Sequence, residues 1–440
     1  MNLKLIALSL LLIPTISYSI PIDWQGSLGF DSTIISEFDN SGNSDADNEA
    51  SFQTYLFKLS PSAIVNDSAT INAEFTTGYG RGGRLGDDST VSQNGSNATG
   101  LYFHHAPTST NSLVVNHLYA EIFGTTATYL VGRHPYHWAL GAIYNDGKDE
   151  WSRHTTIRDG ITMKINLGNF KIEPFISKRY SANSLSSNGK MEEYGATLEY
   201  QNLDSNISLG IYYAKIQNNT ESNIPQNDAS QPLGKSDIKV TDFYIQKTFK
   251  DSKLSLEVPI ISGTIGNANN DSTDVTYSTQ GFVFEGYHKF SDKIELNLYL
   301  GHLQGDHSAS EGEYNTLFLN PNYQIANIMF RYNVEALNDA SQNVFDSYMS
   351  NSLYGKLEGR YIDGKSIWDI GLIYAKANEV SNDQSDDLGL EIDLNYKYQW
   401  NDEMAFHLNS GYYFSGEFFN VGNAEAKNSY IIGLGTILSF

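Results

Sequence analysis

The sequence of 440 residues carries a formal net charge of -23 at pH 7 and contains no cysteine. The acidic excess argues against nucleic acid as a partner, because phosphate backbones are bound through clustered Lys and Arg side chains. The lack of cysteine excludes disulfides and thiol chemistry. A mean hydropathy of -0.37 fits a water-soluble protein as well as a membrane β-barrel, so hydropathy alone does not assign the class.

The first residues have the order of a secretory signal peptide. Lys4 precedes an apolar run at 5–13, which is followed by Pro14 and by small residues at Ser17 and Ser19. The apolar run is too short to span a bilayer as a helix. We expect cleavage after Ser19, which divides the chain into a signal peptide at 1–19 and a single domain at 20–440.

Eighteen runs of the mature chain alternate apolar with polar or small residues at a period of two, the pattern of strands whose two faces meet different surroundings. They cover 23–35, 52–65, 70–79, 112–123, 126–133, 160–167, 170–180, 191–201, 206–217, 236–249, 252–263, 278–290, 294–307, 352–362, 366–377, 388–400, 404–414 and 428–440. A soluble antiparallel sandwich would alternate as well, so the pattern supports a barrel without proving it.

The connections between these runs alternate between short and long along the whole chain. Eight have only a few residues, such as 124–125 and 401–403, and the nine between them run from about 8 to about 44 residues. The sequence therefore predicts an all-β fold, a transmembrane antiparallel up-and-down β-barrel of about 18 strands (16–20), with short periplasmic turns and long extracellular loops. Such a barrel lies in the bacterial outer membrane.

The last run ends on Phe440, a terminal aromatic residue that we expect to serve barrel closure and recognition by the barrel assembly machinery. The expected surroundings are outer-membrane lipid and lipopolysaccharide. The loops at 36–51 and 378–387 are strongly acidic, so they either bridge to lipopolysaccharide through divalent cations or are simply solvated and mutually repelling. The strand parity identifies no flat wall for a trimer, and we favour a monomer without deciding the oligomeric state.

The parity opposite to the apolar one faces the lumen, and it carries charges of both signs. The candidates are Lys164, Glu257, Glu285, Lys356, Arg360, Glu391 and Asp393. Charges of both signs fit a wet pore that screens small solutes. They fit equally well a set of pairs across neighbouring strands that makes the barrel rigid.

Two long loops, at 134–159 and 308–351, have compositions unlike those of spacers. The first is dense in Arg, His, Trp and acidic residues and is expected either to constrict the pore or to form a compact cap on the rim. The candidates for the constriction are Arg133, His137, Asp146, Asp149, Arg153, Arg158 and Asp159. The second loop contains 317–333, which is too apolar for free exposure and is expected to pack on the rim or in the lumen, or to add a strand pair.

Three motifs in these loops carry a resemblance to a known family. They are Gly-Arg-x-Pro-x-x-Trp-x-Leu-Gly at 132–141, Asn-Asp-Gly at 145–147 and Asn-Pro-Asn-Tyr at 320–323. The chain resembles porin-like outer-membrane proteins related to the alginate-export barrels. This resemblance implies 18 strands and long loops that enter or cover the pore. A polyuronate would need a strongly cationic lumen, whereas this one is mixed, so the resemblance extends to the architecture and not to the substrate.

The sequence does not indicate an enzyme. His134 and His137, or His302 and His307, have neither the HExxH frame of a metalloprotease nor a strand spacing that puts both on one face, and no GxSxG motif occurs. We therefore expect no catalytic residues, no metal and no cofactor. The function predicted is passive diffusion of small hydrophilic solutes, with the loops at 134–159 and 308–351 narrowing the pore. The alternatives are surface adhesion or a receptor, a structural barrel, and export of a polysaccharide.

Overall fold

The computed structural model describes residues 21–37, 49–77, 83–84, 113–181, 190–218, 236–265, 274–306, 312–332, 344–345, 347–381, 383–422 and 424–440. The expected signal peptide and most of the acidic loop at 36–51 lie outside these ranges. Within them, no helix is long and apolar enough to cross a membrane.

Eighteen long strands form one antiparallel sheet that closes on itself. The strands are β1 (Ile22–Ser36), β2 (Glu49–Asn66), β3 (Ala69–Thr77), β5 (Leu113–Phe123), β6 (Ala127–Pro135), β7 (Ile157–Leu167), β8 (Phe170–Ser181), β9 (Lys190–Asn202), β10 (Ile207–Asn218), β11 (Ser236–Thr248), β12 (Ser252–Ile265), β13 (Thr276–Lys289), β14 (Ile294–Leu303), β16 (Ser352–Asp363), β17 (Ser366–Ala377), β18 (Asp387–Gln399), β19 (Met404–Ser415) and β20 (Ser429–Ser439). Each one coincides with an alternating run of the sequence, which confirms the predicted fold class.

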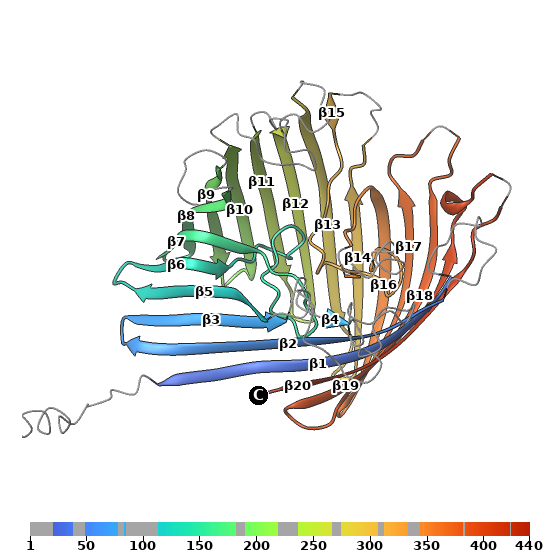
Figure 1. The fold of residues 1–440 in the computed structure, drawn as a ribbon, viewed down its shortest axis with the longest axis horizontal. Helices are drawn as coiled ribbons and strands as arrows, with labels where there is room; N and C mark the ends of the chain where they lie inside the picture. Colours follow the sequence, from blue (N-terminus) through green and yellow to red (C-terminus); the bar gives the residue numbers. More distant parts are fainter. Residues whose placement is uncertain are drawn as a thin grey trace, which may run out of the picture.

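The barrel closes where the first strand meets the last. The pairing of β1 with β20 runs from Ser27 opposite Ser439 to Ser36 opposite Tyr430. Phe440 extends it, because its N–H donates to the carbonyl of Gly26 at 3.0 Å and its carbonyl accepts the N–H of Gly26 at 2.8 Å. Figure 1 shows the resulting wall, with β1 lying along β20 and β19. Closure leaves no unpaired sheet edge between these two strands.

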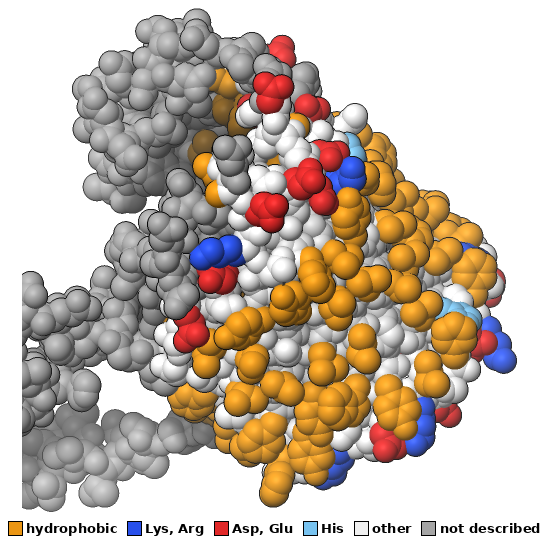
Figure 2. Space-filling view, turned by 90° about the vertical axis from the view of Figure 1, so that its right-hand side faces the viewer, with side chains coloured by type: hydrophobic (Ala, Val, Ile, Leu, Met, Phe, Trp, Pro, Cys, Tyr) orange, Lys and Arg blue, Asp and Glu red, His pale blue; other side chains and the backbone are white. Residues whose placement is uncertain are grey.

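The alternation of the sequence becomes the two faces of this wall. On β18, Ile392 and Leu394 are 44% and 36% exposed, whereas Glu391 and Asp393 between them are 0% and 1% exposed. The apolar parity therefore faces outward and the polar parity faces inward. Figure 2 shows a broad band of hydrophobic side chains on one side of the outer surface, with acidic side chains gathered beyond its upper edge. Such a band is the surface that lipid tails cover.

The connections alternate as predicted, with short turns such as Gly168–Asn169 at one end and long loops at the other. Two further strands have only two residues each: β4 (Gly83–Arg84) pairs with β2, and β15 (Glu313–Tyr314) pairs with β13. The idea that 317–333 adds a strand pair is wrong for its described residues, 317–332, which form turns and irregular chain with one isolated bridge from Phe318 to Ser350.

The hydrophobic core lies inside the barrel and is built by the inward loops against the wall. The larger cluster joins Leu317, Leu319 and Met329 of the β14–β16 loop to wall residues such as Val283 and Ile373. A second cluster packs the β6–β7 loop on β8, β10 and β11. Because loop residues such as Leu317, Leu319 and Trp138 are buried together with wall residues in these clusters, the loops are structural parts of the domain and not external caps.

Candidate functional site

The β6–β7 loop (136–156) enters the lumen through a cluster of aromatic side chains. Tyr144 lies with its ring centroid 4.9 Å from that of Tyr212 on β10, and Tyr136 lies 5.9 Å from the same ring. The guanidinium of Arg158 on β7 is held between the rings of Tyr136 and Phe175, 3.3 Å and 3.4 Å from their centroids. Such cation–π contacts gain strength when they are desolvated, and Arg158 is only 2% exposed. This cluster fixes the start of the loop to the wall.

Two tryptophans of this loop lie on glycines of the wall. A Cβ atom on Gly210 of β10 would lie 2.8 Å from the ring of Trp138, and one on Gly29 of β1 would lie 2.9 Å from the ring of Trp151. Any larger residue at either glycine would therefore displace the ring. Because β10 and β1 are well separated in the wall, the loop reaches across the lumen and contacts two distant parts of the barrel (Figure 1).

Charged wall residues bind the backbone of this loop. Glu257 on β12, which is 0% exposed, accepts the N–H of Leu140 at 2.8 Å and that of Ala142 at 3.5 Å through Oε2. Lys58 on β2 donates from Nζ to the carbonyl of Asp149 at 2.8 Å. A buried carboxylate thus binds N–H groups and a buried ammonium binds a carbonyl, which satisfies the polar groups that loop chain brings into a barrel.

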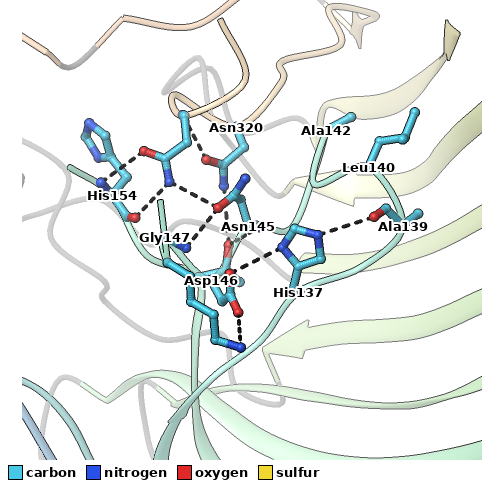
Figure 3. Close-up of polar contacts among 12 residues, drawn as sticks. His137, Ala139, Leu140, Ala142, Asn145, Asp146, Gly147, His154 and Asn320 are labelled. Atoms are coloured by element: carbon cyan, nitrogen blue, oxygen red, sulfur yellow. Dashed lines mark hydrogen bonds and ion pairs between the residues drawn. The ribbon is translucent and has the colours of Figure 1, made fainter. Parts of the chain in front are cut away.

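An ion pair inside the loop shapes its turn. His137 Nδ1 lies 3.4 Å from Asp146 Oδ1, and its Nε2 lies 3.2 Å from the carbonyl of Ala139, as Figure 3 shows. The hydrogen bond to Asp146 raises the pKa of His137, although burial opposes this. Burial would raise the pKa of Asp146, but hydrogen bonds from His137 and Lys148 outweigh it and hold that pKa well below its usual range. The protonated imidazole can donate to both neighbours at once.

The β14–β16 loop (304–351) enters the lumen from the opposite side. Glu391 on β18 accepts three of its backbone N–H groups, from Asn327 at 2.9 Å, Ile328 at 2.7 Å and Met329 at 2.8 Å. On β13, Glu285 accepts the hydroxyl of Tyr323 at 3.0 Å. Glu257, Glu285 and Glu391 are therefore anchor carboxylates, each of which holds an inward loop to the wall.

The two loops meet at the asparagines of the Asn-Pro-Asn-Tyr motif. The N–H of Asn320 donates to the carbonyl of Ala142 at 2.7 Å, and its side chain reaches the carbonyl of Ile143 at 3.3 Å. The Asn322 side chain donates to the carbonyl of His154 at 2.8 Å and accepts the N–H of His154 at 3.1 Å. Figure 3 shows this bridge, in which the loops are joined by backbone and amide groups. Together they form a bar across the lumen.

A cavity of about 320 Å³ remains on one side of this bar, against β1, β19 and β20. Both loops contribute to its lining, together with the wall. The residues that define its chemistry are Asp31, Trp151, Arg153, Arg331, Phe345 and His407. The part of the wall that it touches includes Gly433 and Gly435, whose lack of side chains leaves room.

The cavity carries charges of both signs. Arg153 is fixed by Thr54 Oγ1 at 2.8 Å and Asp31 Oδ1 at 3.3 Å, and its guanidinium lies 3.8 Å from the centroid of the Phe345 ring. Arg331 lines the same cavity and forms no ion pair with any described residue. The lining therefore combines one neutralised and one unpaired guanidinium with aromatic and amide side chains.

The candidates for the constriction are spread over three environments. Asp149 and Arg153 line the cavity, His137 and Asp146 form the turn of the loop, and Arg158 is enclosed by aromatic rings. The expectation for the remaining two is wrong. Arg133 and Asp159 form a bidentate pair, with both distances at 2.7 Å, on the outer face of β6 and β7. They alternate with His134 and Arg158, which are 0% and 2% exposed and face inward.

The candidates for lumen charges all lie on the inward parity of their strands. Glu257, Glu285, Glu391 and Asp393 form hydrogen bonds with the inward loops, so these carboxylates hold the loops in place instead of facing open solvent. Arg360 follows the alternative of pairing across neighbouring strands, since it lies 2.6 Å from Asp369 on β17, whereas Lys356 lies 2.7 Å from Glu358 on its own strand. Lys164 lies beside the turn between β5 and β6.

Sequence reasoning did not find Gly29 and Gly210, and it identified the Asn-Pro-Asn-Tyr motif at 320–323 without predicting that its asparagines join the two loops. A signal was present for Gly29 and Gly210, since glycine inside a strand often marks a close approach of another chain segment. Within the ranges that the structure describes, no group of three or more His, Cys, Asp or Glu residues could hold a metal ion.

Comparisons with known proteins give a fold. The sequence matches no family model and no curated protein. The structure is similar to a BenF-like porin from Pseudomonas fluorescens Pf-5, with a TM-score of 0.52 and 12% identity over 95% of this chain and 99% of that chain. It is similar to OccK5 (OpdH) of Pseudomonas aeruginosa, with a TM-score of 0.51 and 10% identity over 95% and 98%. It is also similar to Pseudomonas aeruginosa OpdK with vanillate, with a TM-score of 0.50 and 13% identity over 95% and 99%. The chain thus has the closed 18-strand antiparallel fold of these porin structures.

Proposed function

We propose that this protein is an outer-membrane channel for the passive diffusion of small hydrophilic solutes. The observation that carries the proposal is the cavity of about 320 Å³ between the two inward loops and the wall of β1, β19 and β20. Along β13, β14, β16 and β17, the larger hydrophobic cluster packs the β14–β16 loop against the wall. A solute that crosses the barrel would therefore follow the cavity side.

The chemistry of the cavity supports polar solutes of small size. Cavities of roughly 300 to 1,000 Å³ are the usual size for small-molecule sites. Asp31, Asp149, Arg153 and Arg331 all line the cavity, and charges of both signs on a pore lining screen solutes at short range. The neighbouring fold of OpdK is solved with vanillate, so small organic acids belong among the solutes to be tested.

Planar-bilayer recordings of the purified protein test the proposal. We expect discrete conductance steps, a reversal potential in asymmetric KCl that reports the charge preference, and partial block by sugars or organic acids that enter the cavity. Absence of conductance at every voltage would refute the channel proposal.

The alternatives differ from it in measurable ways. If the barrel is blocked and serves adhesion or reception, liposome swelling should be absent until the β6–β7 loop is deleted. The motifs at 132–141, 145–147 and 320–323 suggest export of a polysaccharide, because they resemble motifs of the alginate-export barrels. That function would require secretion genes in the neighbourhood of this gene. The mixed charge of the cavity argues against a polyuronate.

The same proposal includes several partners. The signal peptide at 1–19 would direct export, and the strand that ends on Phe440 would be recognised by the barrel assembly machinery. We keep the monomer as the proposed oligomeric state. Mass measurement of the detergent-solubilised protein would test it.

A further inference from the structure

An unbroken row of polar residues crosses the outer face of six neighbouring strands. Direct cross-strand pairing joins one residue to the next along this outer row, which consists of Arg133, Asp159, Lys178, Glu192, Gln217 and Asp237. Every member lies within three residues of the end of its strand that carries a long loop. The row therefore marks the extracellular edge of β6 to β11.

On four of these strands, the next outward-facing residue toward the periplasm is apolar. Val131, Ile161, Ile176 and Tyr194 follow one another in register and are 38%, 47%, 55% and 38% exposed. This is the surface of lipid tails, so the outer row directly above it lies at the level of lipid headgroups.

Two lysines stand at the same step on the next two strands. Lys215 on β10 and Lys239 on β11 lie directly opposite each other. Like charges in that position destabilise a sheet, and lysines at this depth extend toward the polar boundary. Lys215 does so, since its Nζ lies 2.9 Å from Asp237 of the outer row. Lys239 has no such partner among the described residues.

Two cations of this face form no ion pair with a described residue, although Glu192 is the direct cross-strand neighbour of Lys178. Arg133 neutralises Asp159 at 2.7 Å, and Lys215 neutralises Asp237 at 2.9 Å. Lys178 and Lys239 are exposed and form no ion pair with a described residue. They lie on β8 and β11, three strand spacings apart and offset by two residues in register, which separates their Cα atoms by about 16 Å at roughly 4.8 Å per strand and 3.4 Å per residue.

We propose that this face binds the headgroup of lipid A, with Lys178 and Lys239 each contacting one of its two phosphate groups. A disaccharide that carries a phosphate at each end can cover such a span, and an ammonium group at the membrane surface attracts phosphate strongly. The apolar row below accepts the acyl chains. The inference rests on the proposed outer-membrane location and concerns a surface outside the channel.

The test measures lipid binding to the full-length protein in detergent after removal of native lipid. Native mass spectrometry is carried out with added bis-phosphorylated lipid A, monophosphorylated lipid A and phosphatidylglycerol. We expect bis-phosphorylated lipid A to bind most tightly. The double substitution Lys178→Gln and Lys239→Gln should weaken it at least tenfold, and each single substitution should reduce its affinity toward that for the monophosphorylated form.

The matched control is Lys376→Gln, because this lysine also faces outward near a loop end but is paired with Asp386 at 3.2 Å. It should leave lipid binding unchanged. The proposal is overturned if the double variant binds bis-phosphorylated lipid A like the wild type, or if phosphatidylglycerol binds equally well. Bilayer conductance of the same variants separates the lipid A site from the proposed channel function. Loss of lipid binding should leave conductance intact, and a protein without conductance could still bind lipid A selectively.

Discussion

Replacing the anchor carboxylate Glu391 by glutamine should loosen the β14–β16 loop in the lumen. The carboxylate accepts N–H groups at 2.9, 2.7 and 2.8 Å, two through Oε1 and one through Oε2. Glutamine has one acceptor oxygen, so its amide NH₂ would face at least one backbone donor. A hydrogen bond to a charged acceptor contributes about 1.5–3 kcal/mol. A loss of about 2 kcal/mol would raise the population of the detached loop roughly thirtyfold.

Single-channel recording gives the readout. In the Glu391→Gln variant, brief excursions to higher conductance should become roughly thirtyfold more frequent than in the wild type, by the same conversion of free energy to population. Glu358→Gln is the matched control, because Glu358 is also a buried inward carboxylate but binds Asn297 and Lys356 of the wall and no loop residue. If both variants show high-conductance excursions as often as the wild type does, Glu391 does not hold the loop and the reasoning is refuted.

Three further outcomes follow from the site. The pKa of His137 is raised above 6.5, so its bond to Asp146 stabilises the loop fully below pH 6.5 and is lost as the pH rises through that raised pKa. Hydrogen exchange of the backbone amides of 137–147 should therefore accelerate over that pH range. Asp146→Asn should abolish this pH dependence. Gly29→Leu should push Trp151 into the cavity and lower conductance at least twofold, whereas unchanged conductance would argue against this route. Arg331→Gln should move the reversal potential in asymmetric KCl toward cation selectivity, and a shift of the opposite sign would contradict the proposed lining.

The barrel could be predicted from sequence because strand parity and connection length are local properties. The alternation at 388–400 and the short turns need no knowledge of distant residues. The predicted direction of the inward charges, including Glu391, followed from the same parity. Local reasoning also located the two loops that enter the lumen, through their unusual composition.

The site itself depends on contacts that sequence does not encode locally. Asn320 meets Ala142 across nearly half the chain, and nothing in either segment names the other. Arg133 and Asp159 were assigned to the pore because Arg133 is the last residue of the expected strand at 126–133 and Asp159 precedes the expected strand at 160–167. In the structure β6 and β7 continue to Pro135 and Ile157, so pairing fixes both residues on the outward parity. An error of two residues in a strand boundary thus moves a side chain from one face of the membrane wall to the other.

The seam between β1 and β20 also bears on how the protein comes to be permeable. These strands are separated by almost the whole chain, and contacts at such separation form late because they bear the largest loop-closure entropy. The cavity is lined by Asp31 of β1 and Gly433 of β20, one on each side of that seam. An assembly intermediate with an open seam would lack the wall of its own pore. Permeability would then arise in the same step that completes the barrel, so an incomplete barrel would not form a channel through the membrane.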